Sequence, residues 1–149
     1  MPIVQRILSA FSAPKPRPLP EPDARLALGA LMVRVAKSDA AYRVEEIARI
    51  DRILAAANGL NPVEAAQMRA DCEKLERAAP GTGTFAALIR DTVAHEGRLD
   101  TLRALWQVTL ADGVEHAEER DVIETTRIAL GLTAEDNDAA HTAAQMTPK

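Results

Sequence analysis

The sequence predicts an all-α protein, a compact bundle of about seven helices that contains an internally duplicated helical hairpin. Only 3% of the residues are aromatic, although 47% are hydrophobic, and the abundant alanine, leucine, glutamate and arginine are helix formers. Apolar residues recur at helical spacing, and no segment alternates with the period of two that is typical of a half-buried strand. One pattern of apolar and acidic residues also occurs twice. The 149 residues are enough for one hydrophobic core.

The first 22 residues differ from the rest of the chain. Residues 1–11 carry an apolar stripe interrupted by Arg6, which predicts a short amphipathic helix, and residues 12–22 contain five prolines. Closely spaced prolines favour extended backbone, so residues 12–22 are interpreted as a linker. Three roles remain open for the helix: docking on the domain, binding a protein partner, or touching a membrane surface, where its few charges allow only weak contact. The helical domain is predicted to span residues 23–146.

In the first half of the domain, apolar spacing and capping residues place three helices. Residues 26–36 are apolar almost all round, which is typical of a helix in the centre of a bundle. After a break at residues 39–43, a second helix ends at Asn58-Gly59, a left-handed C-terminal stop. Asn61, Pro62 and Glu64 then combine a cap, a first-turn proline and a capping-box acid, which predicts a third helix to about residue 78.

The second half of the domain has similar signals and is predicted to hold four more helices. Trp106 continues the apolar stripe of one of them, so it is expected in the core. The predicted boundaries are a cap at Thr84, a bend at Glu96-Gly97, stops at Asp112-Gly113 and Gly131, and a capping box from Thr133 to Asp136.

An apolar helix followed by an aspartate, two glutamates and an isoleucine occurs twice. The separation is 73 residues for every matched pair, from Asp39 and Asp112 to Ile50 and Ile123, which indicates a duplicated helical hairpin. In each copy the aspartate ends one helix and a glutamate lies in the first turn of the next, so two hairpins that face each other can supply four carboxylates. Such oxygen ligands suit Ca²⁺ or Mg²⁺. Purely structural capping of the helix N-termini is the alternative.

This repeated pattern resembles the tellurite-resistance TerB-like family over roughly residues 24–132. Members of that family are compact helical proteins linked to tellurite and chemical stress, and their acidic turns have been proposed to bind metal. The first copy departs from the family pattern at Ala40-Ala41, and Arg43 and His116 stand where Ser or Thr is expected as the cap. The resemblance implies Asp39, Glu45, Asp112 and Glu118 as metal ligands, with Glu46 and Glu119 as weaker candidates.

Composition and motifs exclude several other classes of protein. A net charge of -4 gives no basic surface for nucleic acid. The single cysteine, Cys72, has acidic neighbours and is expected to be a structural thiol. No apolar run approaches the roughly 20 residues of a membrane span, and residues 1–22 do not form a secretory signal, so the cytoplasm is the expected location.

Known catalytic and metal motifs are also missing from the sequence. The spacing after Asp112 does not fit an EF-hand, and a single Asp138-x-x-His141 does not make a di-iron site. No nucleophilic triad is recognisable, and no catalytic residue is assigned. The expected function is a non-enzymatic, cytosolic TerB-like protein that binds a divalent cation in the response to tellurite or chemical stress. The alternatives are a module that binds a protein partner through its acidic face, residues 112–124, without metal, and a helical enzyme of unknown type.

Overall fold

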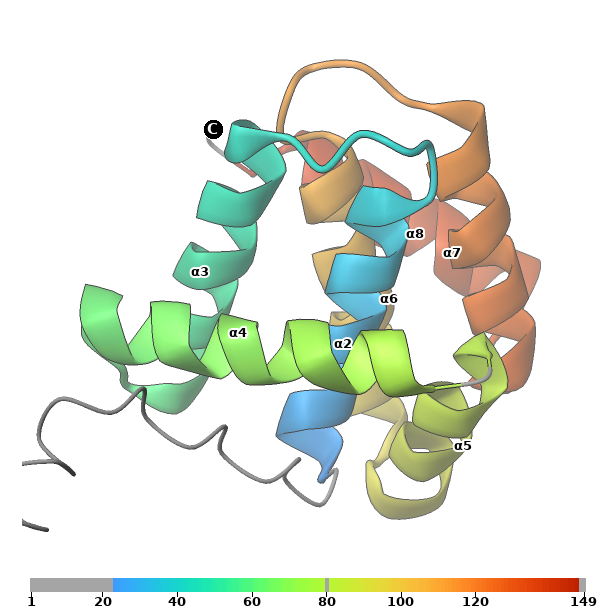
Figure 1. The fold of residues 1–149 in the computed structure, drawn as a ribbon. Helices are drawn as coiled ribbons and strands as arrows, with labels where there is room; N and C mark the ends of the chain where they lie inside the picture. Colours follow the sequence, from blue (N-terminus) through green and yellow to red (C-terminus); the bar gives the residue numbers. More distant parts are fainter. Residues whose placement is uncertain (1–22, 80, 148–149) are drawn as a thin grey trace, which may run out of the picture.

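The computed structural model describes residues 23–79 and 81–147 (Figure 1). This part of the chain contains seven helices and no strand, which confirms the all-α prediction. None of these helices has both the length and the apolar character needed to cross a lipid bilayer. The helices are α2 (Ala24–Lys37), α3 (Val44–Asn58), α4 (Pro62–Ala78), α5 (Thr82–Thr92), α6 (His95–Thr109), α7 (Ala117–Ala129) and α8 (Ala134–Gln145).

Helix α2 is the centre of the bundle, as its apolar sequence predicts. It packs against α3, α4, α5, α6 and α7, and in Figure 1 it lies behind α4 with the other helices around it. Its middle, from Ala30 to Val33, is completely buried. A helix that is apolar all round is stable only where it is surrounded in this way, so α2 organises the core. The core extends to Trp106 on α6, as predicted, and to Cys72 on α4.

Two capping boxes lie where the sequence predicts them. At the start of α4 the Glu64 backbone N–H donates to Asn61 Oδ1 at 2.8 Å, and the Asn61 N–H donates to Glu64 Oε1 at 3.0 Å. Thr133 and Asp136 make the same pair of hydrogen bonds at the start of α8. Gly59 ends α3 with φ at 63°, the left-handed conformation that glycine adopts without strain. These local signals are sufficient to fix three helix ends.

The boundaries of α5 and α6 differ from the prediction. Helix α5 begins at Thr82, after an extended Gly81, and not at Thr84. The break before α6 lies at Val93 and Ala94, so the predicted bend at Glu96-Gly97 is wrong and both residues belong to the first turn of α6. A Cβ on Gly97 would lie 2.3 Å from Cγ1 of Val93. The glycine therefore permits a close approach of the preceding chain and does not interrupt the helix.

The duplicated hairpins are α2–α3 and α6–α7. The segments that join their helices, turn 1 (residues 38–43) and turn 2 (residues 110–116), lie at the same end of the bundle, at the top of Figure 1. Side-chain contacts join them directly: Arg43 of turn 1 forms an ion pair with Asp112 of turn 2, and the His116 imidazole of turn 2 lies 3.4 Å from Asp39 of turn 1. The two copies of the acidic pattern therefore face each other.

Candidate functional site

Turn 1 and turn 2 have the same backbone geometry. In turn 1 the Ala41 N–H donates to Asp39 Oδ1 at 3.1 Å, and in turn 2 the Val114 N–H donates to Asp112 Oδ1 at 3.0 Å. Such bonds from an aspartate to the backbone two residues later stabilise a turn. The residue between has positive φ in both turns, 65° at Ala40 and 83° at Gly113. Each aspartate thereby keeps its Oδ2 atom for contacts inside the site.

Ala40 adopts a backbone conformation that favours glycine, so replacing it with glycine is expected to stabilise the protein. The left-handed region costs an L-residue roughly 1–2 kcal/mol, partly offset by the greater freedom of glycine in the unfolded chain. We expect Ala40→Gly to raise the free energy of unfolding by about 1 kcal/mol in urea denaturation. Gly113→Ala, the reverse change in turn 2, is the matched control and should destabilise. A loss of stability in Ala40→Gly would contradict this explanation.

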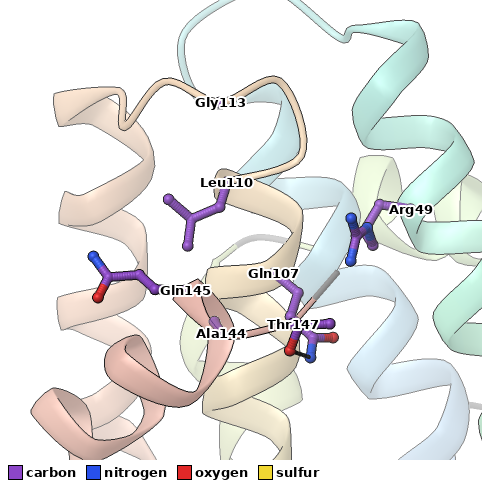
Figure 2. A pocket seen from close by; sticks show the side chains of 7 residues that line it. All are labelled: Arg49, Gln107, Leu110, Gly113, Ala144, Gln145 and Thr147. Atoms are coloured by element: carbon purple, nitrogen blue, oxygen red, sulfur yellow. Dashed lines mark hydrogen bonds between the residues drawn. The ribbon is translucent and has the colours of Figure 1, made fainter. Parts of the chain in front are cut away.

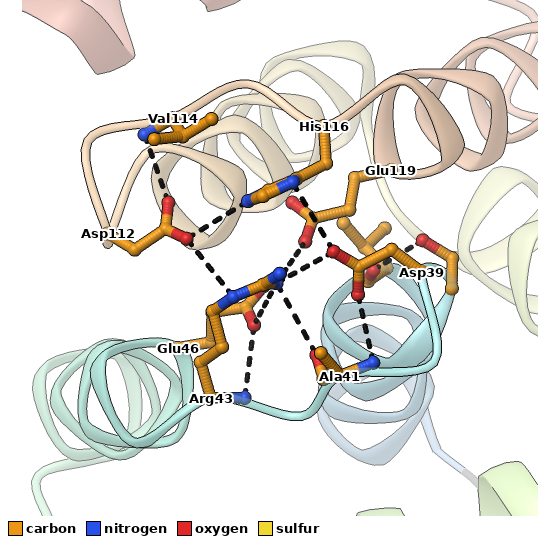
Figure 3. A network of polar contacts seen from close by, with 10 residues as sticks. Asp39, Ala41, Arg43, Glu46, Asp112, Val114, His116 and Glu119 are labelled. Carbon is orange, nitrogen blue, oxygen red and sulfur yellow. Dashed lines mark hydrogen bonds and ion pairs between the residues drawn. The ribbon is translucent and has the colours of Figure 1, made fainter.

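Arg43 and His116 connect the two aspartates crosswise (Figure 3). Arg43 Nη1 lies 2.7 Å from Asp39 Oδ2, and its Nε lies 3.3 Å from Asp112 Oδ2. His116 Nε2 lies 3.0 Å from Asp112 Oδ2, and its Nδ1 lies 3.4 Å from Asp39 Oδ2. Both residues are the N-caps of their helices, 73 positions apart. One permanent cation and one imidazole therefore bridge the turns.

These contacts lower the pKa of both aspartates. Burial alone would raise the pKa of Asp39, but hydrogen bonds from the Arg43 side chain and the Ala41 N–H outweigh it. Burial likewise opposes ionisation of Asp112, and its bonds with His116 and the Val114 N–H lower its pKa. Both aspartates are therefore ionised at neutral pH.

Glu46 and Glu119 lie beneath the aspartates, in the first turns of α3 and α7, and both are completely buried. Glu46 Oε1 accepts a hydrogen bond from the Arg43 backbone N–H at 3.2 Å. Within the described residues, neither carboxyl oxygen of Glu119 meets the geometry of a hydrogen bond, although the Glu46 carboxyl and the Thr109 hydroxyl lie close enough to shift its pKa. Burial and the neighbouring Glu46 carboxyl raise the pKa of Glu119 to about 9, and burial also raises the pKa of Glu46. A buried carboxyl without donors is costly, so it needs a proton or a cation.

The site contains one group of side chains whose spacing fits a metal ion. Ligand atoms of Asp39, His116 and Glu119 all lie within 4.8 Å of one another. Asp112 and Glu46 join this group through Arg43, whose Nη1 lies 3.5 Å from Glu46 Oε1. The six side chains Asp39, Arg43, Glu46, Asp112, His116 and Glu119 form what we call the acidic site. Three come from each hairpin.

The acidic site lies within a region that is similar to one known family. Residues 25–142 match the family described as "Tellurite resistance protein TerB". The chain belongs to the TerB family. No curated protein and no solved structure matches the chain. The match covers both hairpins and both turns, which confirms the resemblance seen in the repeated acidic pattern.

In this TerB-family chain, four of the six predicted ligands come together and two do not. Asp39, Glu46, Asp112 and Glu119 belong to the acidic site. Glu45 and Glu118, which the family pattern placed ahead of their neighbours, are exposed to solvent. One residue along a helix rotates a side chain by about 100°, and only the second glutamate of each pair faces the core. The structure therefore places the two weaker candidates, Glu46 and Glu119, inside the acidic site and the two preferred ones, Glu45 and Glu118, outside it.

Sequence reasoning did not predict the part that Arg43 and His116 play. The sequence identifies them only as unusual caps. The signal in the sequence is that they occupy equivalent positions in the two copies. When two turns face each other, the N-cap side chains of both turns point toward the same space. In the structure each of them contacts both aspartates.

A small pocket of about 150 Å³ lies beside turn 2 in this TerB-family protein (Figure 2). The side chain of Arg49 enters it from α3, and the other walls come from α6, turn 2 and the C-terminal end of α8. Its lining residues are Arg49, Gln107, Leu110, Gly113, Ala144, Gln145 and Thr147. None of them is acidic. The pocket therefore does not belong to the acidic site, although Gly113 is part of the same turn.

Proposed function

We propose that this TerB-family protein is a binding protein rather than an enzyme, and that the acidic site holds one divalent cation. The observation that carries the proposal is Glu119, a completely buried carboxyl with no hydrogen-bond partner among the described residues. It lies within ligand distance of Asp39 and His116. Membership of the family described as "Tellurite resistance protein TerB" supports a role in the response to tellurite or related chemical stress, and we propose the cytoplasm as the setting.

The side chains of the acidic site fit a hard divalent cation. Asp39, Glu119 and His116 would hold the ion, with Glu46 and Asp112 as further oxygen ligands. Ca²⁺ accepts six to eight oxygen ligands in flexible geometry, which suits carboxylates that come from two separate hairpins, whereas Mg²⁺ requires a near-ideal octahedron. The imidazole of His116 is more usual for Zn²⁺ and other transition metals. Ca²⁺ is therefore the first candidate, and Mg²⁺, Mn²⁺ and Zn²⁺ complete the panel to be tested.

Replacing Glu119 with glutamine is expected to weaken cation binding about tenfold or more, because Glu119 can give up its proton to an entering ion and become an anionic ligand, whereas glutamine stays neutral. Isothermal titration calorimetry and thermal unfolding with each ion would measure the effect. Glu118→Gln is the matched control, since it removes the same charge from the adjacent exposed position. The control should bind the ion as the wild type does.

Two results would contradict the cation proposal in different ways. If no ion gives heat or raises the unfolding temperature of the wild type, the acidic site is not a metal site. If Glu118→Gln or Glu45→Gln loses binding and Glu119→Gln keeps it, the ligands are the exposed glutamates of the family pattern instead.

A second candidate function is a protein-binding module without metal. Two large apolar side chains beside the acidic site are exposed, Val44 at 77% and Val114 at 54%. Exposed acidic side chains, Glu45 and Glu118, lie in the first turns of α3 and α7, and such a combination of charge and apolar groups suits a basic and apolar partner. Affinity capture with the wild type and with Val44→Ser/Val114→Ser would test it, and an identical set of captured proteins would show that these two valines do not bind a partner.

The predicted N-terminal helix, residues 1–11, and linker, residues 12–22, lie outside the described residues. Affinity capture with a truncated chain that lacks residues 1–22 would test whether they bind a partner.

A further inference from the structure

The guanidinium of Arg43 lies in the middle of the acidic site, where it contacts all four carboxyl groups (Figure 3). Its Nη1 atom is 2.7 Å from Asp39, 3.5 Å from Glu46 and 3.7 Å from Glu119, and its Nε atom is 3.3 Å from Asp112. No other side chain among the described residues has this set of contacts. Arg43 therefore supplies positive charge at the place where a bound cation would supply it.

The contacts of Arg43 are unequal, and this limits how well it replaces an ion. Strong ion pairs between nitrogen and carboxylate oxygen have distances of about 2.7–2.9 Å, a range that only the contact with Asp39 reaches. The contact with Glu119 is longer and forms no hydrogen bond. Arg43 therefore neutralises charge at the acidic site but leaves the deepest carboxyl without a donor.

The position of Arg43 also allows its side chain to leave without refolding of the helix. Its side chain is 28% exposed, whereas Glu46 and Glu119 below it are buried. Its backbone N–H caps α3 by donating to Glu46 Oε1, a bond that does not involve the guanidinium. Rotation of the long side chain therefore opens the centre of the acidic site while the cap remains.

We propose that Arg43 is a built-in competitor for the divalent cation, so that an ion enters the acidic site only by displacing the guanidinium into solvent. This inference rests on the proposed cation binding. The guanidinium holds the four carboxyl groups together when no ion is bound, and competition weakens the apparent affinity for the ion. The protein then responds to a raised concentration of cation and stays ion-free at a low one.

Calorimetric titration of Ca²⁺ and Mn²⁺ into three variants of the full chain would test the competition. Arg43→Gln keeps a polar side chain but removes the charge, and we expect it to bind the ion about tenfold more tightly than the wild type. Arg43→Lys keeps the charge and should bind as the wild type does. Arg120→Gln removes the same charge from an exposed position near turn 2, 4.0 Å from Glu115, and should change affinity far less.

The outcomes separate this inference from the proposed function. If the wild type binds the ion and Arg43→Gln binds equally or more weakly, Arg43 positions the ligands and the competition is overturned, while the cation site stands. If neither protein binds any ion, both proposals fail. Should Arg43→Gln not fold, the wild type still decides: with ¹⁵N-labelled arginine, the Nε–Hε signal of Arg43 must lose its protection from solvent exchange on saturation with Ca²⁺, and unchanged protection would overturn displacement.

Discussion

The free energy of unfolding of the ion-free protein is expected to fall as the pH rises from 4.5 to 9, by on the order of 3 kcal/mol. Burial, with the Glu46 carboxyl nearby, raises the pKa of Glu119 to about 9 in the folded state from 4.5. The folded state therefore binds more protons than the unfolded state throughout this interval, and stability declines with rising pH. One pKa unit corresponds to about 1.4 kcal/mol, so even part of the shift has a large effect.

Urea denaturation at several pH values in the presence of a chelator would measure this decline. Glu119→Gln resembles the protonated carboxyl and should remove most of the slope, whereas Glu118→Gln should retain it. Below about pH 4 the pH dependence changes direction, and stability falls as the pH falls. Asp39 and Asp112 have lowered pKa values in the folded state, so stability is lost when they are protonated. A wild-type protein whose stability is constant or rises between pH 5 and 9 would show that Glu119 is ionised in the fold.

Replacing Gly29 with alanine is expected to lower the free energy of unfolding by about 2 kcal/mol. Helices α2 and α4 cross at this glycine, and an added Cβ would lie 2.1 Å from Sγ and 3.1 Å from Cβ of Cys72. Both residues are buried, so the helices must move apart to make room. Urea denaturation would measure the loss, which outweighs the higher helix propensity of alanine.

Two further substitutions test whether the contact with Cys72 causes this loss. Gly83→Ala, in α5, has open space around the added methyl group and should be neutral or slightly stabilising. In the double variant Gly29→Ala/Cys72→Ala, the smaller side chain on α4 should restore part of the stability, so the two effects should not add. Additive losses would show that the strain at Gly29 arises elsewhere.

Burial raises the pKa of the Cys72 thiol to about 12, consistent with its predicted structural role.

The parts of the fold that the sequence predicts correctly depend on local chemistry. The boxes at Asn61 and Thr133 and the stop at Gly59 involve residues only a few positions apart, so their signals are visible in the sequence. The start of α6 depends instead on packing, because Gly97 makes room for Val93. In the sequence, Gly97 looks like a residue that interrupts a helix. Only the position of Val93 in the structure shows that the glycine is there to allow close packing.

For the acidic site, the sequence predicted the four carboxyl groups but not their depth or their partners. Helical spacing contains the missing signal for Glu46, since Glu46, Ile50 and Leu54 are each four residues apart and all three are buried. The family pattern favours Glu45 because it matches residues by their position in the sequence. It does not consider which face of the helix each side chain occupies. The contacts of Arg43 with Asp112 depend on how two hairpins dock, and no local pattern within either hairpin specifies that distance.

The acidic site is divided equally between the two hairpins, and this has a consequence for how it is assembled. Each hairpin alone carries an aspartate, an N-cap side chain that contacts both aspartates, and a buried glutamate, which is half of the acidic site. A single hairpin on its own would complete such a site only by pairing with a second copy. Because both halves lie in one chain, they need not be identical, and the N-cap is an arginine in one hairpin and a histidine in the other.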